Sequence, residues 1–144
     1  MNSSFYISES QLPENYILLV DDDDDDRFQM NEFFMANGYT CQMLSSGLAA
    51  IQFLQLLSPA FYPSLIILDY AMPLLNGEEV LLFIKSSTAF ENIPVIIYSS
   101  EMNDYLKSRL KECGAYTCFS KAYKTSQLDD MNRTIESLLL SKGI

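Results

Sequence analysis

Four short segments typical of β-strands are each followed directly by side chains that could take part in ionic or phosphoryl chemistry. Three of these side chains are carboxylates, one is a hydroxyl and one is an ammonium group. In open α/β sheets, ligands bind beyond the carboxyl ends of the strands, so groups in these positions are expected to meet at one rim. The residues are Asp21 and Asp22, Asp69, Ser99 and Lys121.

The three carboxylates would form an unusual cluster unless a cation joined them. Like charges that share a site repel and raise one another's pKa. A hard divalent cation such as Mg²⁺ relieves this repulsion, because it binds one or two carboxylates together with phosphate oxygens and water. Lys121 supplies a second positive charge for an anion. The set therefore predicts a site that holds Mg²⁺ and a phosphoryl group together.

The elements that must position these residues alternate between strands and helices. Apolar residues recur at helical spacing between five short strand-like runs, with Phe28 on the apolar stripe of the first helix and Leu48 on that of the second. Such alternation predicts a parallel sheet with helices on both faces, and right-handed crossovers leave few topologies. One unit of this kind takes up residues 16–140, so residues 1–15 are expected to form a flexible extension and residues 141–144 a tail. The expected strands cover residues 16–20, 40–44, 65–68, 95–98 and 117–120.

Composition narrows the classes of function. Nineteen Asp and Glu residues against nine Lys and Arg residues give a net charge of −10, which disfavours direct binding of nucleic acid. No apolar run approaches the ~20 residues of a membrane span, and the first residues lack a secretory signal, so a cytoplasmic protein is expected. The absence of histidine excludes His-based triads and His-ligated zinc. The three cysteines form no CxxC pair, which predicts free thiols.

Four motifs, in order and at matching spacing, carry a resemblance to a known family. They are ILLVDD at 17–22, LIILDYAMPLLNG at 65–77, IPVIIYSS at 93–100 and GAYTCFSK at 114–121. Across residues 16–140 the chain resembles the receiver domain of two-component response regulators. The resemblance implies an α/β fold, a doubly wound (βα)5 flavodoxin-like sandwich whose parallel five-stranded sheet has the order 2-1-3-4-5.

The resemblance also implies how a metal ion would be bound. Asp21 and Asp22 match the acidic pair that binds Mg²⁺ directly or through water. Asp69 matches the third carboxylate of the metal site. The backbone carbonyl of Ala71 matches the group that completes it, so the Ala71 side chain is not constrained by this role.

The remaining roles concern the phosphoryl group. The resemblance implies that Asp69 accepts it from a sensor histidine kinase or a phosphorelay protein, that the Ser99 hydroxyl meets it, and that Lys121 pairs with one of its oxygens. The expected protein is a stand-alone receiver that switches the binding of an unknown downstream protein. It would not be an enzyme but a phosphoacceptor that assists its own Mg²⁺-dependent phosphotransfer and dephosphorylation.

Two positions near the site lysine depart from the family pattern. The residue after Lys121 is usually proline and is Ala122 here. A cis bond before a non-proline residue costs ~2.5–4 kcal/mol, so a trans bond is expected. The usual aromatic switch position, three residues before the lysine, is Cys118. Switching is therefore expected to run through Ser99 without an aromatic rotation and to be read on the basic helix within residues 101–113.

Three other functions fit parts of the pattern. An EF-hand calcium loop starting at Asp21 would need glycine where Asp26 stands. A phosphatase of the haloacid-dehalogenase type would need a second aspartate where Ala71 stands. The alternative that stays open is a phosphorylation-independent pseudo-receiver, an interaction module. The complete set of site residues argues against it, whereas Ala122 and Cys118 argue for it.

Overall fold

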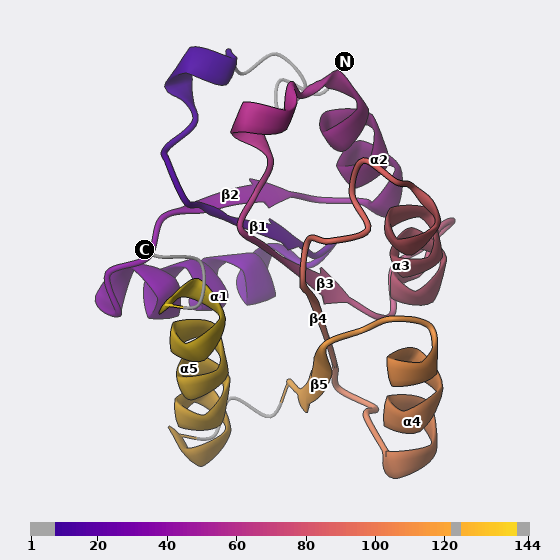
Figure 1. Ribbon diagram of the computed structural model, residues 1–144. Helices are drawn as coiled ribbons and strands as arrows, with labels where there is room; N and C mark the ends of the chain where they lie inside the picture. The colour runs from indigo at the N-terminus through magenta and orange to yellow at the C-terminus, as the bar shows by residue number, and fades with distance from the viewer. Residues whose placement is uncertain (1–7, 122–124, 141–144) are drawn as a thin grey trace.

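Within residues 8–121 and 125–140, which the structure describes, five parallel strands form one sheet in the order β2-β1-β3-β4-β5. Figure 1 shows this computed structural model. The strand order is the one that the family resemblance implied, and each strand starts and ends within one residue of its expected bounds. The strands are β1 (Ile17–Val20), β2 (Cys41–Leu44), β3 (Leu65–Asp69), β4 (Val95–Ser99) and β5 (Thr117–Ser120).

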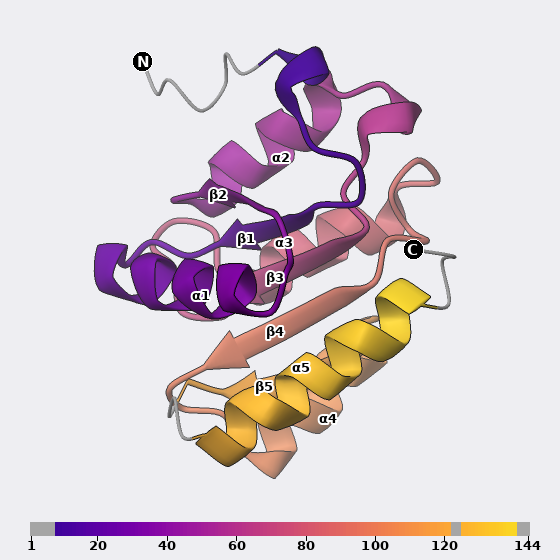
Figure 2. The same cartoon turned by 90° about the vertical axis from the view of Figure 1, so that its left-hand side faces the viewer.

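The helices cover both faces of the sheet and complete a three-layer sandwich. Figures 1 and 2 show α1 and α5 on one face of the sheet, and α2, α3 and α4 on the other. This is the doubly wound arrangement predicted from the alternation of elements. The helices are α1 (Asp24–Ala36), α2 (Gly47–Leu56), α3 (Gly77–Ser86), α4 (Asp104–Glu112) and α5 (Thr125–Leu140).

The central strands are apolar throughout because both of their faces are covered. In β1, Leu18 and Val20 belong to the core on the side of α2, α3 and α4. Ile17 and Leu19 belong to a second core, together with side chains of α1 and α5. Alternate residues of a strand point to opposite faces, so a strand that lies between two layers of helices needs apolar side chains at every position.

The apolar stripes of the first two helices are narrower than the sequence pattern predicts. On α1, Met30 and Phe34 are buried one turn apart, whereas Phe28 is 66% exposed. Residues four positions apart share a helix face, so a residue two positions before Met30 lies on the opposite side. On α2, Leu48 is 52% exposed. The next residue, Ala49, is buried against the core instead.

Part of the segment expected to form a flexible extension contacts the domain. Leu12 is buried, and the Glu9 carboxylate accepts a hydrogen bond from the Ser58 amide at 2.8 Å. The domain boundary at residue 16 stays a prediction. The expected tail and the Lys121–Ala122 bond lie outside the described residues. Among those described, no helix combines the length and apolarity that crossing a membrane would require.

Candidate functional site

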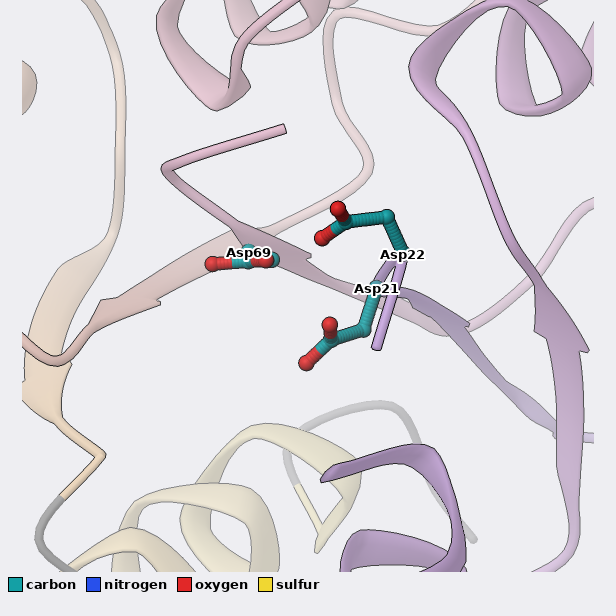
Figure 3. A group of neighbouring side chains, drawn as sticks. All are labelled: Asp21, Asp22 and Asp69. Atoms are coloured by element: carbon teal, nitrogen blue, oxygen red, sulfur yellow. The ribbon is translucent and has the colours of Figure 1, made fainter. Parts of the chain in front are cut away.

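The three predicted carboxylates meet at the carboxyl ends of β1 and β3. Val20 and Leu68 are partners in the register of these strands, so the residues that follow them, Asp21 and Asp69, lie side by side at this edge of the sheet. Figure 3 shows Asp21, Asp22 and Asp69 gathered at this edge. One carboxylate oxygen of each lies within 4.8 Å of those of the other two.

This donor set fits a magnesium ion. Each of the three residues offers a hard carboxylate oxygen, the ligand type that Mg²⁺ prefers. Asp21 and Asp69 are buried, and the exposed Asp22 leaves the cluster open to solvent. Ala71 lies next to the cluster, since its amide donates a hydrogen bond to Asp69 Oδ1 at 3.3 Å. Ligation by its carbonyl stays a prediction.

Lys121 is ion-paired with three aspartates at once. Its Nζ atom lies 3.1 Å from Asp21 Oδ2 and 3.0 Å from Asp69 Oδ1, as expected for a lysine at this rim. The third partner is Asp26, in the first turn of α1, at 2.9 Å. Asp26 ends an acidic run of six aspartates at residues 21–26, and such runs are usually solvated. The available signal was its spacing, because Asp26 lies one helical turn before the buried Met30 and therefore on the same face of α1.

Burial and charge shift the proton affinities of the central pair. Burial raises the pKa of the Asp69 carboxyl to about 7; the hydrogen bond from Lys121 opposes this shift, and the charge of Asp21 adds to it. Burial alone would lower the pKa of Lys121, but the bonds to Asp26 and Asp69 and the charge of Asp21 outweigh it and raise the pKa. The lysine is thus a permanent cation next to a carboxylate that titrates near neutrality.

The raised pKa of Asp69 predicts a stability effect that depends on pH. Between about pH 4 and pH 7 the folded chain binds more protons at Asp69 than the unfolded chain, so this group makes stability fall as pH rises. With metal chelated, we expect Asp69→Asn to unfold several degrees above the wild type at about pH 8. The difference should shrink as the pH is lowered to about 4. Thermal unfolding followed by circular dichroism measures it.

The matched control for that comparison is Asp129→Asn, which changes an exposed aspartate of α5. Its unfolding temperature should follow that of the wild type at both pH values. A lower unfolding temperature for Asp69→Asn at high pH, or a difference from the wild type that does not change with pH, would contradict the prediction.

Tyr98 and Ser99 end β4, the strand next to β3. Ser99 is buried, and its Oγ accepts a hydrogen bond from the Glu101 amide at 3.1 Å. The Tyr98 hydroxyl donates a hydrogen bond to Asp21 Oδ2, and the Tyr98 ring centroid lies 4.8 Å from Lys121 Nζ. Sequence reasoning missed Tyr98, because an aromatic side chain within an apolar strand is typical of a core residue.

The loop after Asp69 is closed by a glycine. The Gly77 amide donates to the Tyr70 carbonyl at 2.8 Å. A Cβ atom at this position would lie 2.7 Å from the Asp69 carbonyl oxygen, closer than side-chain carbons approach such an atom. Asn76 accepts a hydrogen bond from the Glu79 amide and caps α3 at its start. These contacts bring the start of α3 against the strand end that carries Asp69.

Comparison with known proteins gives consistent matches over this fold. Residues 17–133 match the family model of the response regulator receiver domain. The two-component response regulator ARR15 of Arabidopsis thaliana is 31% identical over 140 residues, which cover 92% of this chain and 66% of ARR15. The chain therefore spans just under two thirds of the length of that relative.

Solved structures share the same architecture. The receiver domain of the Francisella response regulator 1452 matches with a TM-score of 0.77 at 21% identity, covering 89% of this chain and 98% of that one. At that identity the match shows the fold alone. The Mn²⁺-bound form of the response regulator Rcp1 matches with a TM-score of 0.71 at 30% identity, covering 85% of this chain and 92% of that one.

Proposed function

Because the chain belongs to the response regulator receiver domain family, we propose that Asp69 accepts a phosphoryl group from a sensor histidine kinase or a phosphotransfer protein. The observation that supports this most directly is the geometry around Asp69. Its buried carboxylate ends β3, lies 3.0 Å from Lys121 Nζ and shares a cluster with two further carboxylates. A nucleophile, a fixed cation and a set of metal ligands are therefore adjacent.

In the proposed transfer, a carboxylate oxygen of Asp69 attacks the phosphorus atom of the donor. A bond forms between that oxygen and phosphorus, the bond between phosphorus and the donor histidine nitrogen breaks, and the nitrogen keeps the electron pair. Lys121 compensates the negative charge that reaches the site, because its ammonium group is already within ion-pair distance of Asp69. When bound, Mg²⁺ would supply positive charge for the phosphoryl oxygens.

The proposed metal ligands are the carboxylates of Asp21, Asp22 and Asp69 and the backbone carbonyl of Ala71. The proximity of the three carboxylate oxygens supports this set. The similar response regulator Rcp1 has been solved in a Mn²⁺-bound form, and Mn²⁺ accepts the same oxygen ligands as Mg²⁺. We propose Mg²⁺ as the ion that serves here.

The test of this function is the intact mass of the chain after incubation with acetyl phosphate and Mg²⁺. A gain of one phosphoryl group would support the phosphoacceptor. An unchanged mass would favour the pseudo-receiver alternative, in which the domain binds partners without phosphorylation. A stand-alone receiver, a cytoplasmic location and self-assisted dephosphorylation stay predictions, as does the identity of the downstream partner.

The expected readout helix, α4, lies next to the position of the missing aromatic switch residue. Cys118 is buried in the same core as Leu110 of α4. Arg109 of α4 donates two hydrogen bonds to Glu78 of α3, at 2.8 and 3.0 Å. Lys107 and Lys111 are therefore the cations of α4 that we propose to meet an acidic partner.

We expect beryllofluoride, a phosphoryl mimic, to shift the amide resonances of residues 101–113, because a bound anion gives the Ser99 hydroxyl a reason to turn toward it. The shifts should shrink in Ser99→Ala and persist in Ser100→Ala, which changes the adjacent exposed serine. Two-dimensional NMR of the three proteins measures them. Equal shifts in wild type and Ser99→Ala, or none in α4, would refute this route of switching.

A further inference from the structure

Tyr98 brings a buried hydroxyl group into a site that is otherwise made of carboxylates, one serine and one ammonium group. Its side chain is 1% exposed, and its Cα is in register with that of Asp69 on the neighbouring strand. A buried tyrosine hydroxyl usually finds a hydrogen-bond partner. Here the partner is Asp21, a proposed metal ligand two strands away in the sheet.

The two oxygens of Asp21 have different partners. Oδ2 accepts the Tyr98 hydroxyl and lies 3.1 Å from Lys121 Nζ. Oδ1 accepts the Asp23 amide at 2.9 Å. A carboxylate offers about four lone-pair sites, two on each oxygen. Among the described residues, the hydroxyl and the ammonium group thus both lie at Oδ2, whereas Oδ1 accepts one amide and keeps a lone-pair site for a cation.

We propose that Tyr98 is a positioning residue for the metal: its hydroxyl holds the Asp21 carboxylate in the rotation that leaves Oδ1 for a divalent cation shared with Asp22 and Asp69. The inference rests on the proposed function, because it concerns the same metal site. A hydroxyl suits this task because it orients the carboxylate without adding a positive charge that would repel the ion. Mutation of a residue that hydrogen-bonds to a metal ligand typically lowers metal affinity by ~10–100-fold.

The experiment compares Tyr98→Phe with the wild type by titration with Mn²⁺, followed by water-proton relaxation in the absence of a phosphoryl donor. The substitution keeps the ring and removes the hydroxyl. We expect the dissociation constant of Mn²⁺ to rise ~10-fold, while the unfolding temperature stays high enough for the protein to be folded during the titration.

Tyr16→Phe is the matched control. Tyr16 is also 1% exposed, and its hydroxyl donates to the Phe61 carbonyl at 2.6 Å, in the core on the other face of the sheet. The Tyr16→Phe variant also loses one hydroxyl from an equally buried tyrosine, so its stability can change, but its affinity for Mn²⁺ should not. Equal weakening in both variants would overturn the inference, because it would point to a general loss of structure.

A double-mutant cycle with Asp21→Asn tests whether Tyr98 acts through Asp21. The titration covers Mn²⁺ concentrations up to the millimolar range. Tyr98→Phe should weaken Mn²⁺ binding when Asp21 is present and have little further effect when Asp21→Asn is already in place. An unchanged dissociation constant in Tyr98→Phe, or the same loss in both backgrounds, would overturn the inference. A wild type that bound no Mn²⁺ would overturn both the inference and the proposed metal site. If Tyr98→Phe bound Mn²⁺ more weakly than the wild type, but the wild type gained no mass with acetyl phosphate, the inference would be supported and the proposed phosphoacceptor overturned.

Discussion

Replacing Asp69 with asparagine should abolish phosphorylation of the chain by acetyl phosphate. Among the described aspartates, Asp69 is the one that ends β3, and its carboxylate contacts the ammonium group of Lys121 at 3.0 Å. An amide is neutral and far less nucleophilic than a carboxylate, so the attack on phosphorus would be lost. Intact-mass spectrometry should show one added phosphoryl group in the wild type and none in Asp69→Asn.

Asp25→Asn is the matched control for this loss. Asp25 is an exposed aspartate of the acidic run and lies outside the carboxylate cluster, so the gain of mass should persist in this variant. Modification that persisted in Asp69→Asn would contradict the assignment. Peptide mapping would then decide whether a neighbouring aspartate of the cluster had replaced Asp69 as the acceptor.

After Asp69→Asn, the largest loss of phosphorylation should follow removal of the metal or of one of its proposed ligands. We expect chelation of Mg²⁺ to stop phosphorylation. Asp22→Ala should slow it by at least ~10-fold, because even the loss of a residue that only hydrogen-bonds to a metal ligand lowers metal affinity by about this factor. Asp22 is exposed, so its loss should leave the fold intact. The initial rate of mass gain at several Mg²⁺ concentrations measures the effect.

Asp25→Ala controls for the loss of one charge from the acidic run and should keep the wild-type rate. Binding of Mg²⁺ itself should be weak without phosphate, because this ion gives up its waters reluctantly. The chain contains no tryptophan, so calorimetry or NMR is needed to follow it. Phosphorylation at an equal rate with and without the metal would refute the proposed role of the carboxylate cluster.

The fold could be predicted from the sequence because its signals are local. Residues 65–68 are apolar without interruption, which is typical of a strand covered on both faces, and the segment that contains Asn76 and Gly77 has the composition of a turn. Parallel strands end at a common edge, so the alternation of elements predicted that Asp21 and Asp69 lie on one rim. That β1 and β3 are neighbours in the sheet was implied by the family resemblance. Phe28 was misplaced because it was assigned to the stripe of Met30, although two positions separate opposite sides of a helix. Leu48 was misplaced because the sheet covers the face of the smaller Ala49 instead.

The partners of Lys121 and Asp21 depend on contacts between distant segments. Asp26 and Lys121 are 95 positions apart in the sequence, and Tyr98 and Asp21 are 77 apart. The apolar pattern of β4 predicts that Tyr98 is buried. The same pattern would arise whether its hydroxyl stayed within the core or reached a carboxylate, so it does not identify the partner. Which acidic side chain meets the lysine depends on where the first turn of α1 lies relative to the end of β5. That placement is set by the volumes of the side chains that pack between the helices and the sheet. The sequence therefore identified the groups that carry the chemistry, whereas the packing of the elements determined which of them form ion pairs or hydrogen bonds with one another.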